Sequence, residues 1–196
     1  MDIKQEFSAS QTILLIMPSS DYNKEIVEIM KKFSGKNVAY ITLNKTRDSL
    51  VELFKQNKIN IDNVVFVDAI SKTIKSAPDQ SDGVYYVSSP GALTEIGIVI
   101  SKFLRHNFDY LVFDSLTNLL VYENKAPIGK FVSSLVNKIK ESKTKAVFYA
   151  LSVEEQQTMI KESGMFVDKV IELDKKSTKT TKSKSTKTKS KAKKSK

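Results

Sequence analysis

Cysteine is absent from this sequence of 196 residues, and histidine occurs once, at His106. Without cysteine the chain can form neither a disulfide framework nor a thiolate metal site, and a single histidine cannot supply a histidine cluster. Metal chemistry would therefore depend on carboxylates alone. We assign no metal-binding residue.

Long apolar runs are also missing. The first apolar run covers residues 13–17, and the acidic residues Asp2 and Glu6 precede it. This run is too short for the apolar segment of a signal peptide. We therefore expect a soluble, cytoplasmic protein without membrane insertion.

The net charge of +10 is confined to the C-terminal end of the chain. Residues 174–196 hold 11 lysines and one aspartate, whereas residues 1–173 hold 21 basic and 21 acidic side chains. The C-terminal segment consists almost entirely of Lys, Ser and Thr, and such a composition has too little apolar surface to fold alone. We expect one domain over residues 1–173, with its core at about 11–173, and a disordered tail over 174–196.

The basic tail is predicted to bind nucleic acid or another polyanion without sequence preference, because phosphates attract any lysine-dense chain. It has no aromatic residue to stack on bases. An anionic membrane surface is an alternative partner, although the tail has no apolar anchor, and a solubilising extension without a partner is another. The lysines expected to make the contacts are Lys175, Lys176, Lys179, Lys182, Lys184, Lys187, Lys189, Lys191, Lys193, Lys194 and Lys196.

Short apolar or β-branched runs recur along the first 173 residues and are candidate strands. Most of them are continuously apolar rather than alternating, which is typical of parallel strands covered on both faces by helices. We therefore expect an α/β fold of three layers with right-handed crossovers. The runs are residues 12–17, 38–43, 64–69, 84–87, 110–113, 146–151 and 169–173.

The segments between these runs carry helical signals. Apolar residues recur at helical spacing within residues 26–33, 93–103 and 128–139. Ser89 followed by Pro90 predicts an N-cap with proline at the first helical position, and Ser152 with Glu155 predicts a capping box. The polar segment 71–82 is predicted to be a surface loop.

One candidate strand ends in an acid, with Asp114 and Ser115 directly after the run 110–113. A carboxylate delivered by a buried strand to the carboxyl edge of a parallel sheet is typical of a nucleotide site. The alternative is a structural aspartate that caps the turn or helix after the strand by accepting local backbone N–H groups.

The phosphate loop that should accompany such an acid is degenerate. A working loop reads G-x-x-x-x-G-K-[ST], whereas residues 18–25 read PSSDYNKE. Pro18 has no backbone N–H and a fixed φ, so it cannot replace a flexible glycine around a pyrophosphate. Glu25 puts a carboxylate where a magnesium-binding hydroxyl is needed, and only Lys24 matches the motif.

The order of elements resembles the KaiC/RecA-like P-loop superfamily, in particular the small, divergent KaiC-like domains common in archaea. The likeness covers about residues 11–173, with 110–115 in the place of the Walker B strand and 18–25 in that of a degenerate Walker A motif. The resemblance implies a RecA-like, mostly parallel sheet with helices on both faces. It places Ser19, Ser20, Asn23, Lys24, Asp114 and Ser115 at the family's nucleotide site.

The resemblance also implies an acid at the end of the second strand, where the family polarises the attacking water. Here residues 42–45 read TLNK, without a carboxylate, so a bound triphosphate would not be hydrolysed. Asp68, at the end of the third candidate strand, is the nearest unassigned acid, and we give it no catalytic role.

We therefore predict a catalytically degenerate KaiC/RecA-like domain, a pseudo-ATPase without catalytic residues or a bound cofactor, that serves as a binding, scaffold or regulatory module. Its predicted partners are a polyanion through the tail and, by resemblance, a second copy or an active KaiC/RecA-like paralogue. The alternative is an ATP-binding protein or ATPase with an unorthodox loop that uses Lys24 and Asp114 with Mg²⁺. A receiver-like signalling domain fits less well, because only Asp21 follows the first candidate strand where clustered acids are needed.

Overall fold

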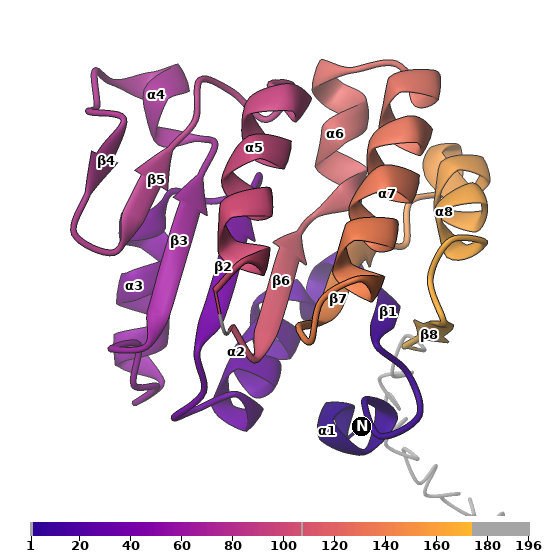
Figure 1. Cartoon of the computed structure of the whole chain (residues 1–196), viewed down its shortest axis with the longest axis horizontal. Coiled ribbons are helices and arrows are strands. Elements are labelled where there is room, and N and C mark those ends of the chain that lie inside the picture. The colour runs from indigo at the N-terminus through magenta and orange to yellow at the C-terminus, as the bar shows by residue number, and fades with distance from the viewer. Residues whose placement is uncertain (1, 107, 174–196) are drawn as a thin grey trace, which may run out of the picture.

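A computed structural model of the chain describes residues 2–106 and 108–173. Its centre is a sheet of eight strands in the order β4-β5-β3-β2-β6-β7-β1-β8 (Figure 1). Every neighbouring pair is parallel except β4 with β5. The strands are β1 (Thr12–Met17), β2 (Val38–Thr42), β3 (Val64–Asp68), β4 (Gln80–Ser81), β5 (Val84–Tyr86), β6 (Tyr110–Asp114), β7 (Lys145–Leu151) and β8 (Lys169–Glu172).

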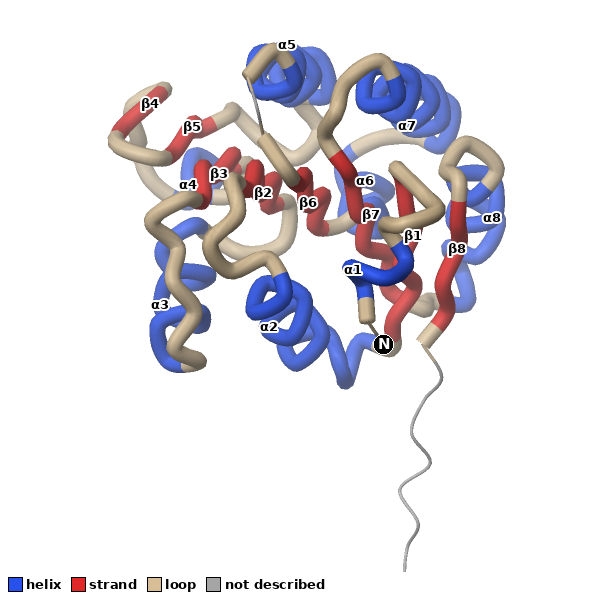
Figure 2. The backbone as a smooth tube through the Cα atoms, turned by 60° about the horizontal axis from the view of Figure 1, so that its bottom comes forward, coloured by secondary structure: helices blue, strands red, loops and turns tan. Residues whose placement is uncertain are grey.

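Helices cover both faces of the sheet, so the predicted α/β architecture of three layers is confirmed (Figure 2). The helices α5, α6, α7 and α8 pack on one face, and α1, α2 and α3 pack on the other. The bounds are α1 (Ile3–Glu6), α2 (Tyr22–Lys32), α3 (Arg47–Gln56), α4 (Ser71–Ile74), α5 (Leu93–Leu104), α6 (Leu116–Tyr122), α7 (Lys125–Lys140) and α8 (Gln157–Gly164), with 3₁₀ turns at η1 (Ser19–Asp21) and η2 (Glu154–Gln156). No helix in the described part of the chain is long and apolar enough to cross a membrane.

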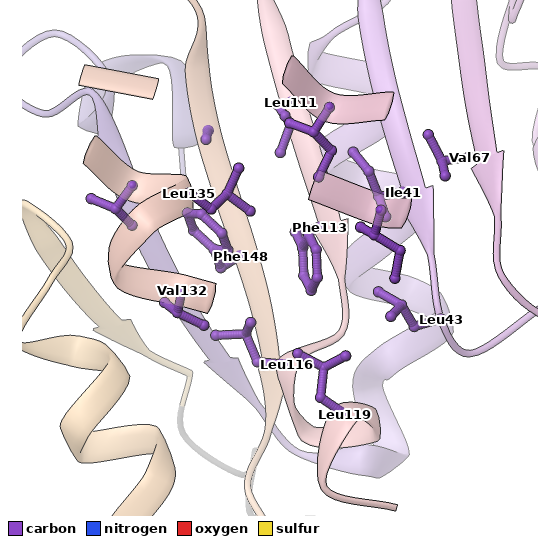
Figure 3. Packing of buried hydrophobic residues seen from close by; sticks show 14 of the residues in the cluster. Ile41, Leu43, Val67, Leu111, Phe113, Leu116, Leu119, Val132, Leu135 and Phe148 are labelled. Atoms are coloured by element: carbon purple, nitrogen blue, oxygen red, sulfur yellow. The ribbon is translucent and has the colours of Figure 1, made fainter. Parts of the chain in front are cut away.

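The continuous apolar character of the strands follows from this double coverage. Side chains alternate between the two faces of a strand, so Leu14 of β1 joins the core under α5 to α8, whereas Ile13 and Leu15 join the core over α1 to α3. Figure 3 shows the first of these cores, where Phe113 and Phe148 of neighbouring strands meet with ring centroids 5.8 Å apart.

The three predicted helical segments are confirmed as α2, α5 and α7. In each of them the apolar residues at helical spacing face the sheet, as in α7, where Ile128, Val132 and Leu135 are buried. The apolar stripe rather than local propensity fixes these helices, because most helical stability in proteins comes from packing.

The prediction that Ser89 and Pro90 begin a helix is wrong. Helix α5 begins at Leu93, because residues 89–92 close a turn in which the Ala92 N–H donates to the Ser89 carbonyl at 3.1 Å. The N-cap residue is Ala92, which makes no side-chain capping hydrogen bond. The Glu95 carboxylate in the first turn of α5 instead holds the preceding loop, because it accepts from the Ser88 backbone N–H at 2.9 Å and from the Ser88 hydroxyl at 2.7 Å.

The predicted capping box at Ser152 and Glu155 does not form either. Residues 154–156 form the 3₁₀ turn η2, whose N-cap Val153 makes no side-chain hydrogen bond, and helix α8 begins only at Gln157. Ser152 instead donates its backbone N–H to the Met17 carbonyl at 2.8 Å. It therefore extends the β7 to β1 ladder and does not cap a helix.

The segment 71–82, predicted as a surface loop, is partly ordered into elements. It contains helix α4 and the edge strand β4, which pairs antiparallel with β5. Ser71 is buried, and its hydroxyl is satisfied because it donates to Asp68 at 2.7 Å. Most other residues of this segment are exposed, as expected for a surface loop.

The N-terminal residues contribute to the core, although the resemblance began only near residue 11. Ile3 and Phe7 are buried in the core over α2, and the Phe7 ring lies 5.6 Å from that of Tyr110. Helix α1 and the residue after it therefore pack at the start of β6 and β7, where Lys145 also donates to the Phe7 carbonyl at 2.7 Å.

Asp168 ties the last strand to the first. Its carboxylate accepts from the backbone N–H groups of Gln11 at 3.0 Å and Thr12 at 2.9 Å, and from the Thr12 hydroxyl at 2.9 Å. Lys140 completes the site with an ion pair of 2.9 Å. Burial raises the pKa of Asp168, but the hydrogen bonds from Lys140, Thr12 and Gln11 outweigh burial and lower the pKa to about 2.

Because this folded-state pKa lies below the usual value, Asp168 stabilises the fold above about pH 4, and the contribution is lost as the pH falls through about 2. We expect Asp168→Asn to lower the unfolding free energy by about 1–2 kcal/mol at pH 7, a range reduced for the partly exposed carboxylate. Urea denaturation at pH 7 and pH 2 tests this. An equal loss of unfolding free energy in Asp168→Asn at both pH values would contradict this role of Asp168.

Candidate functional site

The candidate site lies at the carboxyl edge of the sheet, where the parallel strands β1, β2, β6 and β7 end. At this edge β6 delivers Asp114, β2 leads into Lys45, and β1 leads through η1 into α2. Ligands of open α/β sheets bind outside the carboxyl ends of the strands. This edge is therefore the place to compare with a nucleotide site.

Asp114 is fully buried, and its partners come from distant parts of the chain. The Tyr22 hydroxyl donates to Asp114 Oδ2 at 2.5 Å, and the Tyr40 hydroxyl donates to the same oxygen at 2.7 Å. Tyr22 opens helix α2, and Tyr40 lies in the middle of β2. The alternative of an aspartate that caps the following turn is therefore wrong, because its side-chain hydrogen bonds come from tyrosines.

A third buried tyrosine completes what we call the tyrosine–aspartate cluster, namely Asp114, Tyr22, Tyr40 and Tyr149. Phe113 of β6 pairs with Phe148 of β7, so Asp114 and Tyr149 are the next residues along these two neighbouring strands. Among the described residues, neither Asp114 Oδ1 nor the Tyr149 hydroxyl has a hydrogen-bond partner, although both are buried. Burial of a polar atom without a partner is costly.

Burial sets the protonation of this cluster. It raises the pKa of Asp114 to about 6, while the hydrogen bonds from Tyr22 and Tyr40 and the charge of Lys45 lower that pKa in part. Burial, and then the charge of Asp114, raise the pKa values of Tyr22, Tyr40 and Tyr149. At neutral pH the carboxylate is therefore mostly ionised and the three tyrosines are neutral, with Tyr22 and Tyr40 as its donors.

The segment in the position of the phosphate loop is a compact turn. Pro18 precedes the 3₁₀ turn η1, and α2 starts directly after it at Tyr22. The side chain of Lys24 is 55% exposed and lies 3.9 Å from the Glu25 carboxylate. It therefore points along the helix surface and not toward Asp114.

The six residues predicted at the nucleotide site are thus divided by the structure. Ser19, Ser20, Asn23 and Lys24 are exposed, whereas Asp114 and Ser115 are fully buried. Whether any of them binds a nucleotide stays a prediction, and the lysines predicted in the tail lie outside the described residues.

The sequence reasoning missed the three tyrosines. Tyr22 lies inside the degenerate loop itself, and Tyr40 and Tyr149 are hydroxyl-bearing residues in otherwise apolar strands. That pattern is the signal that could have found them, because a buried tyrosine hydroxyl usually needs a partner.

Lys45 covers the cluster from the loop after β2. Its ammonium group lies 5.7 Å from the centroid of the Tyr22 ring, within cation–π range. The loop is held by the Thr42 hydroxyl, which donates to the Lys45 carbonyl at 2.6 Å. A cation therefore follows β2 where the resemblance implied an acid.

The residues after Asp114 join three strands at this edge. The Ser115 and Thr117 hydroxyls lie 2.9 Å apart, and Thr117 accepts from the backbone N–H of Leu151 at the end of β7. Asn118 donates its side-chain amide to the Leu43 carbonyl at 2.9 Å. Ser115 and its neighbours are thus engaged in structural hydrogen bonds.

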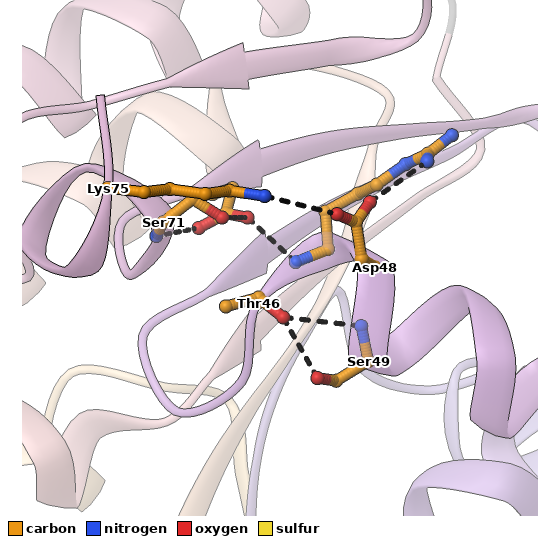
Figure 4. Close-up of polar contacts among 7 residues, drawn as sticks. Thr46, Asp48, Ser49, Ser71 and Lys75 are labelled. Carbon is orange, nitrogen blue, oxygen red and sulfur yellow. Dashed lines mark hydrogen bonds and ion pairs between the residues drawn. The ribbon is translucent and has the colours of Figure 1, made fainter. Parts of the chain in front are cut away.

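Asp68 is satisfied by local groups in the same way. It accepts from the backbone N–H groups of Arg47, Ile70 and Ser71 and from the Ser71 hydroxyl, at 2.7–2.8 Å. Figure 4 shows the surrounding contacts. The Thr46 side chain caps α3 by accepting from the Ser49 backbone N–H, and Lys75 forms an ion pair with Asp48. Asp68 therefore anchors the starts of α3 and α4. Within the described ranges, no three His, Asp or Glu side chains gather as a metal site.

Comparison with solved structures identifies the class of fold. The chain is similar to a KaiC-like protein from the hyperthermophilic archaeon Pyrococcus horikoshii OT3, with a TM-score of 0.60 and 13% sequence identity over 86% of this chain and 74% of that one. The chain therefore has a KaiC/RecA-like fold. It belongs to DUF7090, a family of unknown function, whose model matches residues 3–183. No curated protein matches it.

The raised pKa of Asp114 has a consequence for stability. The folded-state pKa is about 6, above the usual 3.8. The contribution of Asp114 to the unfolding free energy should therefore fall as the pH rises from 3.8 to about 6, and it should stay constant at higher pH. The loss is on the order of 2–3 kcal/mol. We expect Asp114→Asn to remove this decline, measured by urea denaturation between pH 4 and pH 7.

The matched control is Asp82→Asn, at an exposed acid in the loop between β4 and β5. This variant should keep the decline of the wild-type protein. Identical pH profiles for the wild-type protein and Asp114→Asn would show that Asp114 titrates normally.

Proposed function

We propose that this chain is a KaiC/RecA-like domain that does not hydrolyse nucleotide and serves as a binding, scaffold or regulatory module. The observation that carries the proposal is the hydrogen bond from Tyr22 to Asp114. It joins the phosphate-loop position to the Walker B position through protein side chains, where a nucleotide site would keep its acid available for magnesium and water.

The fit of this edge to a triphosphate with magnesium is poor. Asp114 is fully buried, and both of its hydrogen bonds to tyrosine involve the same oxygen. Pro18 offers no N–H to a phosphate, and Glu25 would lie near phosphate oxygens of the same sign. The residues present therefore do not match the group that the fold class implies, and we derive no catalytic step through it.

The groups that would activate water are also missing from the end of β2. Lys45 occupies that loop with its ammonium group over Tyr22. A lysine there cannot act as a carboxylate that polarises the attacking water. This supports a module without hydrolysis rather than an ATPase with an unorthodox loop.

We expect no change in melting temperature when the full-length protein is heated with millimolar ATP and Mg²⁺. A ligand at about 100 times its Kd stabilises the native state by about 2.7 kcal/mol, which is roughly 5–10 °C for a chain of this size. Differential scanning fluorimetry detects such a shift.

The matched variant for this experiment is Lys24→Ala, which removes the one residue that agrees with the phosphate-loop motif. On our proposal it melts like the wild-type protein with or without ATP. A shift in the wild-type protein that disappears in Lys24→Ala would refute the proposal and support the ATP-binding alternative.

The second part of the proposal concerns residues 174–196, for which we propose sequence-independent binding of nucleic acid or another polyanion. Its support is the charge distribution, since 11 of the 32 basic residues lie there and the other 173 residues are electrically balanced. We further propose that the folded part pairs with a second copy or with an active KaiC/RecA-like paralogue, and that the protein is cytoplasmic.

Deletion of residues 175–196 should abolish binding to duplex DNA in a filter-binding assay and leave the melting temperature unchanged, because it removes all the excess positive charge. The intact protein should show a log–log salt slope of about −0.9 per phosphate contacted. Undiminished affinity in the truncated protein would assign DNA binding to the folded part.

A further inference from the structure

A groove of about 710 Å³ runs between α5 and α7 on the outer side of the molecule. Figures 1 and 2 show both helices on the same face of the sheet. Gly97 lines the groove beside Phe131, which is half-buried, and a Cβ added at Gly97 would lie 3.7 Å from the Phe131 ring. Ile98, on the next position of α5, is 55% exposed. The groove therefore presents apolar side chains that the fold itself does not cover.

Positive charge surrounds this apolar floor. The lining residues described for the groove include no acid, and they include four basic residues, two from α5 with its C-cap and two from α7. None of the four forms an ion pair with a carboxylate in the described part of the chain, and Lys138 only donates to the Ser101 hydroxyl at 3.0 Å. The four are Lys102 of α5, Arg105 at the C-cap of α5, and Lys130 and Lys138 of α7.

This concentration of charge is local. Residues 1–173 carry 21 basic and 21 acidic side chains, so the folded part has no general positive field. Unpaired cations around an apolar groove complement a ligand that carries an apolar stripe between carboxylates. An acidic amphipathic helix has that pattern.

The dimensions of the groove agree with a helical ligand. Helix α5 has 12 residues, so its axis is about 18 Å long, which matches about three turns of a helix lying beside it. Single-stranded nucleic acid needs aromatic faces for its bases. Phe131 is the one aromatic side chain among the described lining residues, and it is packed against Phe113 with ring centroids 5.9 Å apart.

We propose that the groove between α5 and α7 is a docking site for an acidic amphipathic helix of a partner protein. This names the kind of partner that the module binds, so it rests on the proposed binding function. It does not depend on the nucleotide experiment or on the tail, because the groove lies on the helical face of the sheet, away from Asp114.

The test uses the full-length protein and a fluorescein-labelled synthetic peptide of about four helical turns, with leucine at every third or fourth position and glutamate elsewhere. Fluorescence anisotropy is measured at about 0.3 M salt, which weakens purely electrostatic contacts with the lysines of residues 174–196 more than contacts that also bury apolar surface in the groove. We expect saturable binding of this peptide. A peptide in which lysine replaces every glutamate should not bind.

Two variants examine the two features of the groove separately. Ile98→Asp places a carboxylate on the apolar floor, and the double variant Lys102→Glu with Lys130→Glu reverses part of the rim. Each should weaken binding roughly tenfold or more, because the central contacts of an interface dominate its affinity. The matched control is Lys55→Glu, at an exposed lysine of α3 on the opposite face of the sheet, which should bind like the wild-type protein.

All the substituted side chains are exposed, so the melting temperatures should stay within a few degrees of the wild-type value. Photo-cross-linking from a leucine position of the peptide should label α5 and α7. Absence of binding, labelling confined to residues 174–196, or equal affinity in the groove variants would overturn the proposal.

Two other occupants would give distinct results that also overturn it. In the first, a single-stranded oligonucleotide displaces the peptide and itself binds the groove variants more weakly than the wild-type protein. That result would assign the groove to nucleic acid. A dimer in sedimentation velocity that Ile98→Asp dissociates would assign it to a second copy of the chain.

Discussion

The hydrogen bond between Tyr22 and Asp114 is the contact on which the arrangement of the sheet edge depends. It requires α2 to begin at Tyr22, and that start requires the compact turn η1 directly after Pro18. The same bond offsets part of the cost of burying a carboxylate under the loop of Lys45. A loop that wrapped a phosphate would have to give up this contact.

The two sides of the molecule therefore differ in what they can offer a ligand. The carboxyl edge of the sheet is filled by tyrosine side chains, which support our proposal that nucleotide chemistry has been lost there. The face that carries α5 and α7 leaves apolar side chains and unpaired cations accessible. We therefore place the proposed binding surface on the face that carries α5 and α7 and not at the carboxyl edge of the sheet.

The fold could be predicted from the sequence because its determinants are periodic. Seven of the eight strands and the three main helices follow from apolar runs and helical spacing, whereas β4 has two exposed residues and no such pattern. The helix starts predicted at 89–90 and 152–155 were wrong, because residues 89–92 form a turn and Ser152 instead bonds to Met17, which is distant in sequence. The tyrosine–aspartate cluster escaped prediction because its hydrogen bonds are distant in sequence: Tyr40 and Tyr22 lie 74 and 92 residues from Asp114.

The most direct test of the account is a crystal structure of the full-length protein grown with a non-hydrolysable ATP analogue and Mg²⁺ at millimolar concentration. Our account predicts the Tyr22 hydroxyl on Asp114 and no analogue over the start of α2. A triphosphate bound there, with Tyr22 displaced and Lys24 turned toward it, would contradict the account.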